Sequence, residues 1–332
     1  MYETRFIARG NCFMSNIRDI AKEAGVSVTT VSRVINNHPY VTEEKKNKVM
    51  QAMKTLNYIP NHLAVNLSRG KSTVIAVVFP WITNPCYLRI LEGAIKQASL
   101  YHYHIIVIET HYKEDEEIKA LEMLKHRSID GIIFITKQLP IDAIYDYEKY
   151  GPIVLMEKND YLPYIFIDQY EAMKKALNYL MSENYKKIGY SVHRKNGFSA
   201  NERAKAYATL PEDMQYKEFI YFSGLSLTEG KQLAQKILKQ TNLPDALIVT
   251  NDAHCAGLFA EFQNQGIKVP EDIALISYEN GELSQVNNIT SIDLPLAQMG
   301  ERSVELILSN TAAAEELPST LIIRKSTRNS AK

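Results

Sequence analysis

The chain has 332 residues, of which 45% are hydrophobic and 23% charged, so it can form two or three domains with apolar cores and is not a disordered polymer. Its 38 Lys and Arg residues balance its 38 Asp and Glu residues. No apolar run is long enough to span a bilayer and residues 1–14 lack the apolar stretch of a signal peptide, so we expect a cytoplasmic protein without membrane association. The three cysteines, Cys12, Cys86 and Cys255, lie too far apart in sequence for a disulfide framework or a metal clip.

The neutral total hides an uneven distribution of charge. Residues 1–72 hold eleven basic against five acidic side chains, a surplus of six, and the other 260 residues hold 27 basic against 33 acidic side chains. A basic head on an acidic body indicates a polyanionic partner for the head alone. Ordinary solvated helices can carry a surplus of this size, so charge does not decide the function by itself.

Two short helices are predicted within the basic head. Residues 17–24 have apolar side chains at helical spacing behind the N-cap Asn16, and Gly25 ends this helix. Residues 28–35 form a second helix behind the N-cap Ser27, with Val31, Val34 and Ile35 on one face. Two helices joined through a glycine turn predict a helix-turn-helix.

The free face of the second predicted helix suits base recognition in the major groove. Thr29 and Thr30 each offer a methyl and a hydroxyl group, and Arg33 can contact a guanine through two hydrogen bonds. A third helix beginning at Thr42 and ending near residue 60 would close a three-helix core. A small helical bundle with surface threonines remains an alternative on these residues alone.

Three runs of the head decide between these alternatives. They are Ile17 to Ser27 (IRDIAKEAGVS), Thr30 to Asn36 (TVSRVIN) and Leu56 to Asn61 (LNYIPN). In these three runs the chain resembles the lactose/galactose repressor family, and the resemblance extends from Met14 to about Arg328. Residues 37–41 (NHPYV) and 69–71 (RGK) are most similar to the catabolite control protein branch of Gram-positive bacteria.

The resemblance implies that residues 14–60 bind double-stranded operator DNA, as part of a homodimer, and that residues 61–73 are a hinge segment. Leu67 matches the family leucine that wedges between base pairs and kinks the duplex. Residues 1–13 lie outside the family pattern, and we expect them to be a non-native extension preceding a native start at Met14. The DNA-binding residues implied by the resemblance are Ile17, Ser27, Val28, Thr29, Thr30, Ser32, Arg33, Asn36, Tyr58, Asn61, Leu63, Ala64 and Leu67.

From Val74 onward, short apolar strands alternate with amphipathic helices, which predicts parallel sheets covered on both faces. The strands are too many for one compact sheet, so we expect two doubly wound lobes, similar to the periplasmic-binding-protein-like body of the family. This body would span 74–328, with an N-lobe of about 74–167 plus 295–318 and a C-lobe of about 168–290 plus 319–328. The predicted strands are 74–79, 104–108, 131–135, 153–156, 164–167, 187–192, 219–222, 246–250, 273–278 and 321–324.

Four residues match effector-binding positions of the family: Asn84, Tyr87, Arg203 and Asp252. An arginine and an acid on opposing loops suit a polyol such as a sugar or a sugar phosphate. Arg203 could instead be a surface cation, and Asp252 could cap the helix that follows it. Leu225 replaces the usual sugar-stacking aromatic residue, which leaves room for a serine-phosphorylated phosphocarrier protein as the partner.

The sequence contains no glycine-rich nucleotide loop, hydrolase elbow or zinc-binding spacing, so we expect no catalytic residue, metal or cofactor. We predict a sequence-specific DNA-binding transcriptional regulator, a repressor of carbon-source or catabolite genes controlled by a small molecule or the phosphocarrier protein. The alternative is an α/β sugar- or nucleotide-processing enzyme with an accessory helical domain. Substrate turnover by a chain lacking residues 1–70 would favour the enzyme.

Overall fold

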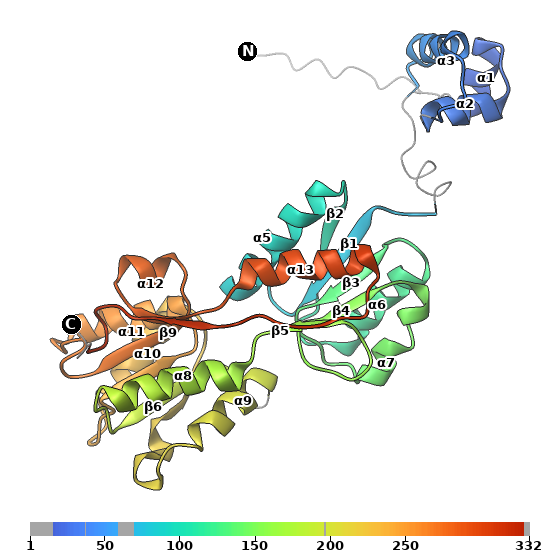
Figure 1. The fold of residues 1–332 in the computed structure, drawn as a ribbon. Helices are drawn as coiled ribbons and strands as arrows, with labels where there is room; N and C mark the ends of the chain where they lie inside the picture. The colour runs from blue at the N-terminus through green and yellow to red at the C-terminus, as the bar shows by residue number, and fades with distance from the viewer. Residues whose placement is uncertain (1–15, 37, 59–69, 196, 329–332) are drawn as a thin grey trace, which may run out of the picture. The chain divides into compact units, whose positions relative to one another are not determined.

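The computed structural model describes residues 16–36, 38–58, 70–195 and 197–328 (Figure 1). The chain divides into two compact units, residues 1–72 and residues 73–332. The first unit is a small helical headpiece and the second is a larger α/β body. None of the helices in the described residues has both the length and the apolar character of a membrane span.

The headpiece contains the three predicted helices. They are α1 (Ile17–Ala24), α2 (Val28–Ile35) and α3 (Glu43–Thr55). The Asn16 side chain accepts a hydrogen bond of 3.3 Å from the Asp19 amide, and the Asp19 carboxylate accepts one of 2.9 Å from the Asn16 amide. This reciprocal pair is a capping box, which fixes the first residue of α1. Gly25 ends α1 in the left-handed region with a φ of 61°, where a side chain would be strained.

One fully buried side chain from each helix meets at the centre of the headpiece: Ile20, Val31 and Val49. Smaller apolar residues of the same helices fill the space around them, and Tyr58 packs at the margin. Because the buried positions of α2 face this core, the opposite side of α2 is left to solvent. The three-helix core predicted from the apolar spacing is confirmed.

The body contains two six-stranded sheets. The first has the order β11-β5-β4-β3-β1-β2 and the second the order β12-β10-β9-β8-β6-β7. The strands of the first sheet are β1 (Val74–Phe79), β2 (His104–Glu109), β3 (Gly131–Phe134), β4 (Ile153–Leu155), β5 (Tyr164–Phe166) and β11 (Ala314–Glu316). Those of the second sheet are β6 (Ile188–Val192), β7 (Ile220–Phe222), β8 (Ala246–Val249), β9 (Ala274–Glu279), β10 (Thr290–Asp293) and β12 (Thr320–Ile322). Neighbouring strands run parallel, with the exception of the antiparallel pair β10 and β12.

Helices cover both faces of each sheet, as a doubly wound fold requires (Figure 1). In β1, for example, Ile75 to Phe79 are all fully buried, so neither face of this strand meets solvent. The helices around the first sheet are α5 (Pro85–Leu100), α6 (Glu114–Lys125), α7 (Ile141–Tyr145) and α13 (Leu296–Ser309). Those around the second sheet are α8 (Gln169–Ser182), α9 (Phe198–Tyr207), α10 (Leu227–Ile237), α11 (Asp252–Asn264) and α12 (Glu282–Val286).

The packing of α5 against α13 depends on two glycines. A Cβ atom on Gly93 would lie 1.8 Å from the Ala297 carbonyl oxygen, and one on Gly300 would lie 1.9 Å from the Ile90 carbonyl oxygen. These distances are far inside van der Waals contact, so any side chain would force the helices apart. The first residues of α5 line the site described below, and α13 therefore helps to hold that edge of the site in place.

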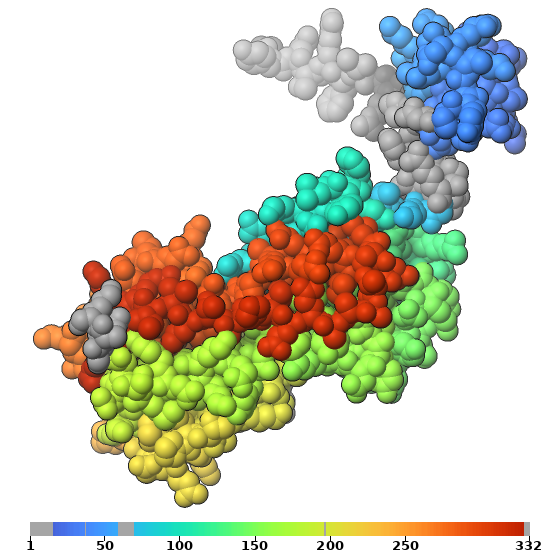
Figure 2. Space-filling view, in the orientation of Figure 1, coloured from blue at the N-terminus to red at the C-terminus, as the bar shows by residue number. Residues whose placement is uncertain are grey.

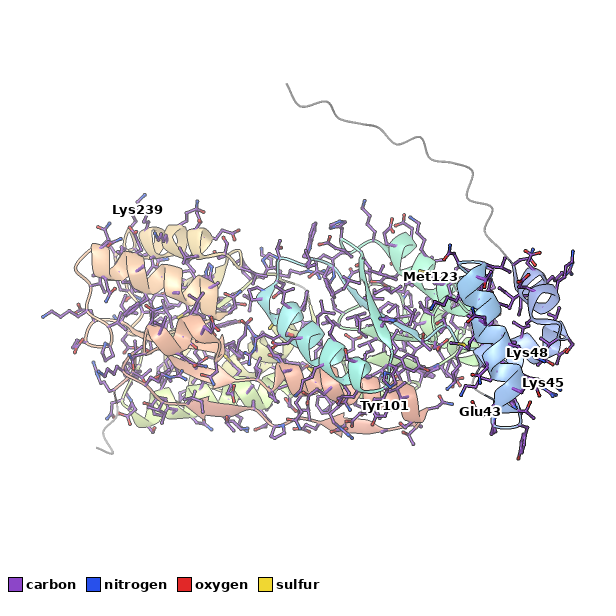
Figure 3. All side chains as sticks on the ribbon, turned by 90° about the horizontal axis from the view of Figure 1, so that it is seen from above. Glu43, Lys45, Lys48, Tyr101, Met123 and Lys239 are labelled. Carbon is purple, nitrogen blue, oxygen red and sulfur yellow. The ribbon has the colours of Figure 1, made fainter. Side chains whose placement is uncertain are left out.

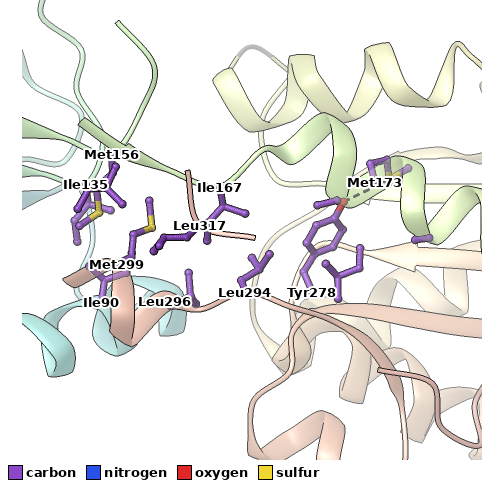
Figure 4. Close-up of a cluster of buried hydrophobic side chains, with 14 of the residues drawn as sticks. Ile90, Ile135, Met156, Ile167, Met173, Tyr278, Leu294, Leu296, Met299 and Leu317 are labelled. Carbon is purple, nitrogen blue, oxygen red and sulfur yellow. Dashed lines mark hydrogen bonds between the residues drawn. The ribbon is translucent and has the colours of Figure 1, made fainter. Parts of the chain in front are cut away.

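The chain passes between the lobes three times, after β5, after β10 and after β11. Each passage carries a buried apolar side chain, respectively Ile167, Leu294 and Leu317, and these belong to one core with Met299 and Tyr278 on either side (Figure 4). The C-terminal segment, red in Figure 2, accordingly lies over both lobes. Three connections that lie side by side and share an apolar core form a hinge. This arrangement allows two lobes to close around a ligand.

Candidate functional site

The exposed face of α2 is the candidate nucleic-acid interface of the headpiece. Ser27, Val28, Thr29 and Arg33 are exposed. Val28 is a β-branched apolar residue with 42% of its surface exposed, so its side chain is accessible to a partner beside Thr29 and Arg33. No carboxylate among the described residues forms an ion pair with Arg33, so the guanidinium is available to phosphate oxygens or to a guanine edge.

The Ser27 hydroxyl fixes the start of α2. It accepts a hydrogen bond of 3.1 Å from the Thr30 amide and lies 2.9 Å from the Thr30 hydroxyl. Thr30 is half-buried, so its hydroxyl belongs to the cap as much as to the free face. At the other end, the Asn36 side-chain amide donates a hydrogen bond of 3.0 Å to the Ser32 carbonyl. These local bonds leave Val28, Thr29 and Arg33 as the side chains that project freely.

The other predicted DNA-contacting residues differ in their position. Ile17 and Tyr58 are half-buried and pack against the headpiece core. The remaining four lie outside the described residues: Asn61, Leu63, Ala64 and Leu67. The structure therefore brings together on one helix only part of the set that the resemblance implies.

Much of the charge on α3 is paired within the helix. Lys48 Nζ lies 2.8 Å from a Glu44 carboxylate oxygen, and Lys46 Nζ lies 3.6 Å from a carboxylate oxygen of Glu43. The hydrogen bond from Lys48 lowers the pKa of Glu44, which stays ionised. The positive surplus of the described headpiece therefore falls on exposed basic side chains outside these two ion pairs, namely Arg18, Lys22, Arg33, Lys45 and Lys54.

The candidate effector site is a cavity of about 250 Å³ between the two lobes of the body. Its walls come from loops that follow the carboxyl ends of strands in both sheets, which is where open α/β sheets bind ligands. Asn84, Tyr87 and Arg203 line this cavity together, so the structure unites three of the four predicted effector residues. Asp252 is not among the lining residues.

Arg203 brings a buried cation to the cavity. The residue lies on α9 and is 8% exposed. Its guanidinium donates to Gln169 Oε1 at 3.2 Å and to Thr250 Oγ1 at 3.5 Å, and its Cζ lies 3.7 Å from the centroid of the Tyr278 ring. Its Nε has no partner among the described residues. A buried guanidinium with two neutral acceptors and a free N–H is suited to an oxygen-rich ligand.

Glu279 is an acidic group in the cavity that we did not predict. It lies at the end of β9 and is 4% exposed. Burial raises the pKa of its carboxyl to about 7, while a hydrogen bond from Cys86 opposes this shift. Arg89, on α5 of the other lobe, donates a hydrogen bond of 2.5 Å to the Glu279 carbonyl. A carboxyl that is half protonated near neutral pH can both donate to and accept from ligand hydroxyls.

Asn84 and Tyr87 hold the first-lobe edge of the cavity. Asn84 caps α5 by accepting a hydrogen bond of 3.1 Å from the Cys86 amide. Burial raises the pKa of the Tyr87 hydroxyl well above its usual range, so this group stays protonated as a potential donor. Glu157, another lining residue, forms an ion pair of 3.1 Å with Lys137 and is therefore already neutralised.

The Asp252 carboxylate takes part in a hydrogen-bond network outside the residues that line the cavity. It accepts hydrogen bonds from the Ser277 hydroxyl at 2.6 Å, from the Ser284 hydroxyl at 3.2 Å and from the Gly281 amide. A direct contact with a ligand would require these bonds to break. The helix cap that we considered for Asp252 belongs instead to Asn251, which accepts a hydrogen bond of 2.8 Å from the His254 amide and also lines the cavity.

Sequence reasoning missed several cavity residues besides Glu279. These are Cys86, Thr136, His193, Arg194, Thr250 and Asn251. Most follow the carboxyl end of a strand, and that position is the signal that could have identified them. Among the described residues, no group of three or more His, Cys, Asp or Glu side chains could hold a metal ion.

Two family models match the chain. Residues 16–61 match the model described as bacterial regulatory proteins, lacI family, and residues 72–331 match that of periplasmic binding proteins and the sugar binding domain of the LacI family. The helix-turn-helix and the two-lobed body thus both fall within one protein family.

Relatives and a solved structure agree with these matches. The chain is 39% identical to an uncharacterized HTH-type transcriptional regulator, YkvZ, of Bacillus subtilis, over 89% of this chain and 92% of the relative. It is 34% identical to catabolite control protein B of the same organism, over 90% of this chain and 96% of the relative. The fold matches the lac repressor dimer bound to operator and the anti-inducer ONPF with a TM-score of 0.81 at 23% identity, covering 95% of this chain and 99% of that chain.

These matches also exclude the alternative that the sequence left open. The similar proteins are transcriptional regulators and not sugar- or nucleotide-processing enzymes. The predicted fold, a helix-turn-helix headpiece on a two-lobed α/β body, is confirmed. It differs in detail, because β12 joins the second sheet antiparallel to β10, and β10 and β11 are strands that the sequence did not predict. The chain belongs to the LacI family of bacterial regulatory proteins and is a DNA-binding transcriptional regulator.

Proposed function

We propose that this regulator is a homodimeric repressor whose two α2 helices each recognise one half of a pseudo-palindromic operator. Its interlobe cavity binds the effector that controls the affinity for this operator. The free face of α2 carries the proposal, because it places Val28, Thr29 and Arg33 outward on a helix capped at its N-terminus. Such a helix can direct its first amides to phosphate and its side chains to base edges.

Each exposed side chain of α2 has a distinct role in this proposal. Arg33 contacts a guanine through two hydrogen bonds, Thr29 contacts a base edge through its hydroxyl or methyl group, and Val28 packs against a thymine methyl. Thr30, Ser32 and Asn36 stabilise the ends of α2 and contact the sugar-phosphate backbone of the DNA. Ile17 and Tyr58 contribute phosphate contacts at the edges of the headpiece, and the hinge residues Asn61, Leu63, Ala64 and Leu67 engage the minor groove.

Dimerisation is supported by an exposed apolar surface on the first lobe. Leu88 and Ile95 lie two helical turns apart on α5 and are 44% and 47% exposed. Val107, on the edge strand β2, is 38% exposed, and Tyr101 follows α5 at 53% (Figure 3). A second copy related by a two-fold axis would bury these side chains and would place two α2 helices on one operator.

The effector is proposed to bind between Arg203 and Glu279 of the second lobe and Asn84 and Tyr87 of the first lobe. Relatives named catabolite control protein A, catabolite control protein B and ribose operon repressor support carbon-source genes as targets. A sugar or sugar phosphate would accept hydrogen bonds from the Arg203 guanidinium, which lines the cavity. A serine-phosphorylated phosphocarrier protein is the other proposed controlling partner. Either changes DNA affinity only if it prefers one arrangement of the lobes over the other.

Footprinting on genomic fragments tests the proposal. The full-length protein is compared alone, with sugars, with sugar phosphates and with the serine-phosphorylated phosphocarrier protein. The proposal expects a protected site of two inverted half-sites whose occupancy changes with one of these additions. A footprint without two-fold symmetry would contradict the homodimer, and a footprint that none of the additions alters would contradict control through the cavity.

A further inference from the structure

We propose that the effector cavity continues into a second subsite formed around Trp81, and that the effector is a two-ring carbohydrate whose second ring carries no anionic group and stacks there. This inference rests on the proposed effector role of the interlobe cavity. It concerns Trp81 and Tyr112 of one lobe, with His111 packed against Trp81, and Leu225 to Leu227 of the other lobe. Of these residues, the sequence drew attention only to Leu225, as the replacement of a stacking aromatic residue.

The second hollow adjoins the first and is larger. It measures about 590 Å³, against about 250 Å³ for the cavity that contains Arg203. Four residues line both hollows: Asn84, Tyr112, His193 and Leu225. Sites for small ligands typically measure about 300–1,000 Å³, so the first hollow alone falls below this range and the two together fall within it. A ligand of one ring would leave most of the space unfilled.

Trp81 forms a flat aromatic surface in the second hollow. Its side chain is 41% exposed, and its ring centroid lies 4.3 Å from that of His111 and 6.5 Å from that of Tyr112. The Arg194 guanidinium carbon, from the second lobe, lies 4.0 Å from the Tyr112 ring centroid and so extends this wall across the lobes. An exposed aromatic face with polar groups at its edges suits the C–H face and hydroxyl rim of a pyranose.

Hydrogen bonds hold the aromatic surface in position. The Glu109 carboxylate, at the end of β2, accepts one of 2.8 Å from the Ile82 amide and lies 3.8 Å from His111 Nε2. The His111 amide donates one of 3.0 Å to the Pro80 carbonyl. His111 and Tyr112 both have left-handed backbone conformations, with φ values of 51° and 60°. Strained non-glycine residues in succession persist where the surrounding structure fixes them, and they concentrate at binding sites.

The opposite wall disfavours an anionic group on the second ring. Leu225 and Leu227 supply apolar surface without an aromatic ring, so stacking in this hollow falls to Trp81. The Glu229 carboxylate also lines the hollow, and hydrogen bonds from Ser226 lower its pKa, so that it stays ionised. An anionic group would be repelled by Glu229. Thr83 and Ser226 provide hydroxyl groups at the rim for a neutral sugar.

The protein carries its own probe for this subsite, because Trp81 is the one tryptophan in the sequence. The full-length protein is titrated with a library of monosaccharides and of disaccharides that contain the same sugars, with intrinsic fluorescence and calorimetry as readouts. We expect a disaccharide to bind roughly tenfold more tightly than its monosaccharide and to change the tryptophan emission. Calorimetry with Trp81→Ala should show the loss of this gain, with monosaccharide affinity unchanged.

Tyr150→Ala is the matched control, since Tyr150 is also an aromatic residue with 41% exposure but does not line either hollow. The control should keep the full gain in affinity of the disaccharide over the monosaccharide. If Trp81→Ala does not fold, Trp81→Phe replaces it in the test and should keep part of this gain. The proposal is overturned if no carbohydrate binds, if monosaccharides and disaccharides bind equally, or if Trp81→Ala keeps the gain. Failure of the proposed repressor function would show separately, as the absence of a symmetric operator footprint.

Discussion

Replacing Arg203 with methionine should abolish effector binding while the protein stays folded. The guanidinium has two neutral acceptors at 3.2 Å and 3.5 Å, a free Nε and no carboxylate partner among the described residues. A buried charge so weakly compensated adds little to the stability of the fold. Its stacking on Tyr278, at 3.7 Å from the ring centroid, contributes about 1–2 kcal/mol, and methionine retains part of that contact.

The loss of effector affinity is expected to be much larger. Ligand oxygens that accept two charge-assisted hydrogen bonds from the guanidinium would gain about 1.5–3 kcal/mol from each. The sum corresponds to a decrease in affinity of at least about 100-fold. Binding of operator DNA without effector should not change, because Arg203 belongs to the body and not to the headpiece.

The assay measures the effector concentration that half-maximally shifts the operator footprint, together with urea unfolding. Arg328→Met is the matched control, because the Arg328 guanidinium carbon also lies over a tyrosine ring, 4.8 Å from the Tyr185 centroid, outside the cavity. The control should respond to effector as the unchanged protein does. An Arg203→Met protein with normal effector affinity would refute the assigned role, and one that lost several kcal/mol of unfolding free energy would show that the cation is structural.

Three further predictions follow from other parts of the molecule. Arg33→Ala should lose about 1–3 kcal/mol of discrimination at one operator base pair and little at the others; competition with single-base-pair operator variants measures this, and an unchanged preference would remove Arg33 from base recognition. Gly300→Ala should lower the free energy of unfolding by about 1–3 kcal/mol through its clash with α5, whereas Gly197→Ala, which meets no atom within 4 Å, should be neutral in thermal denaturation. Burial raises the pKa of Glu279 to about 7, above the value of an unfolded chain, so the folded state binds its proton more tightly and the stability it contributes falls as the pH rises from about 4.5 to 7. Glu279→Gln should remove that part of the pH dependence of urea unfolding, and an identical profile in the variant would contradict the buried carboxyl.

The sequence predicted best those elements whose causes are local. The capping box at Asn16 and the left-handed Gly25 specify α1 through their own neighbours. The near-continuous apolar character of the long strands likewise predicts that both of their faces are buried. β10 (Thr290–Asp293) and β11 (Ala314–Glu316) were not predicted, because their residues are mostly polar and only pairing with neighbouring strands makes them strands.

The candidate site was predicted in part, because burial and partners depend on the tertiary fold. The sequence gives no sign that Arg203 is 8% exposed with a free Nε, or that the Asp252 carboxylate is occupied by two serines and an amide. Trp81 lies three residues before the matched Asn84 in sequence, yet its role depends on His111, which follows a different strand and packs against it. Contacts between loops of different strands cannot be read from spacing along the chain.

The affinity of the full-length protein for its operator, with and without saturating effector, tests the central claim most directly. Fluorescence anisotropy on an operator duplex identified by footprinting gives both values at one salt concentration. If the cavity controls the headpiece, the two dissociation constants should differ by about 5-fold to 150-fold, the range of typical allosteric coupling. Identical constants, with calorimetry showing that the effector is bound, would contradict the account.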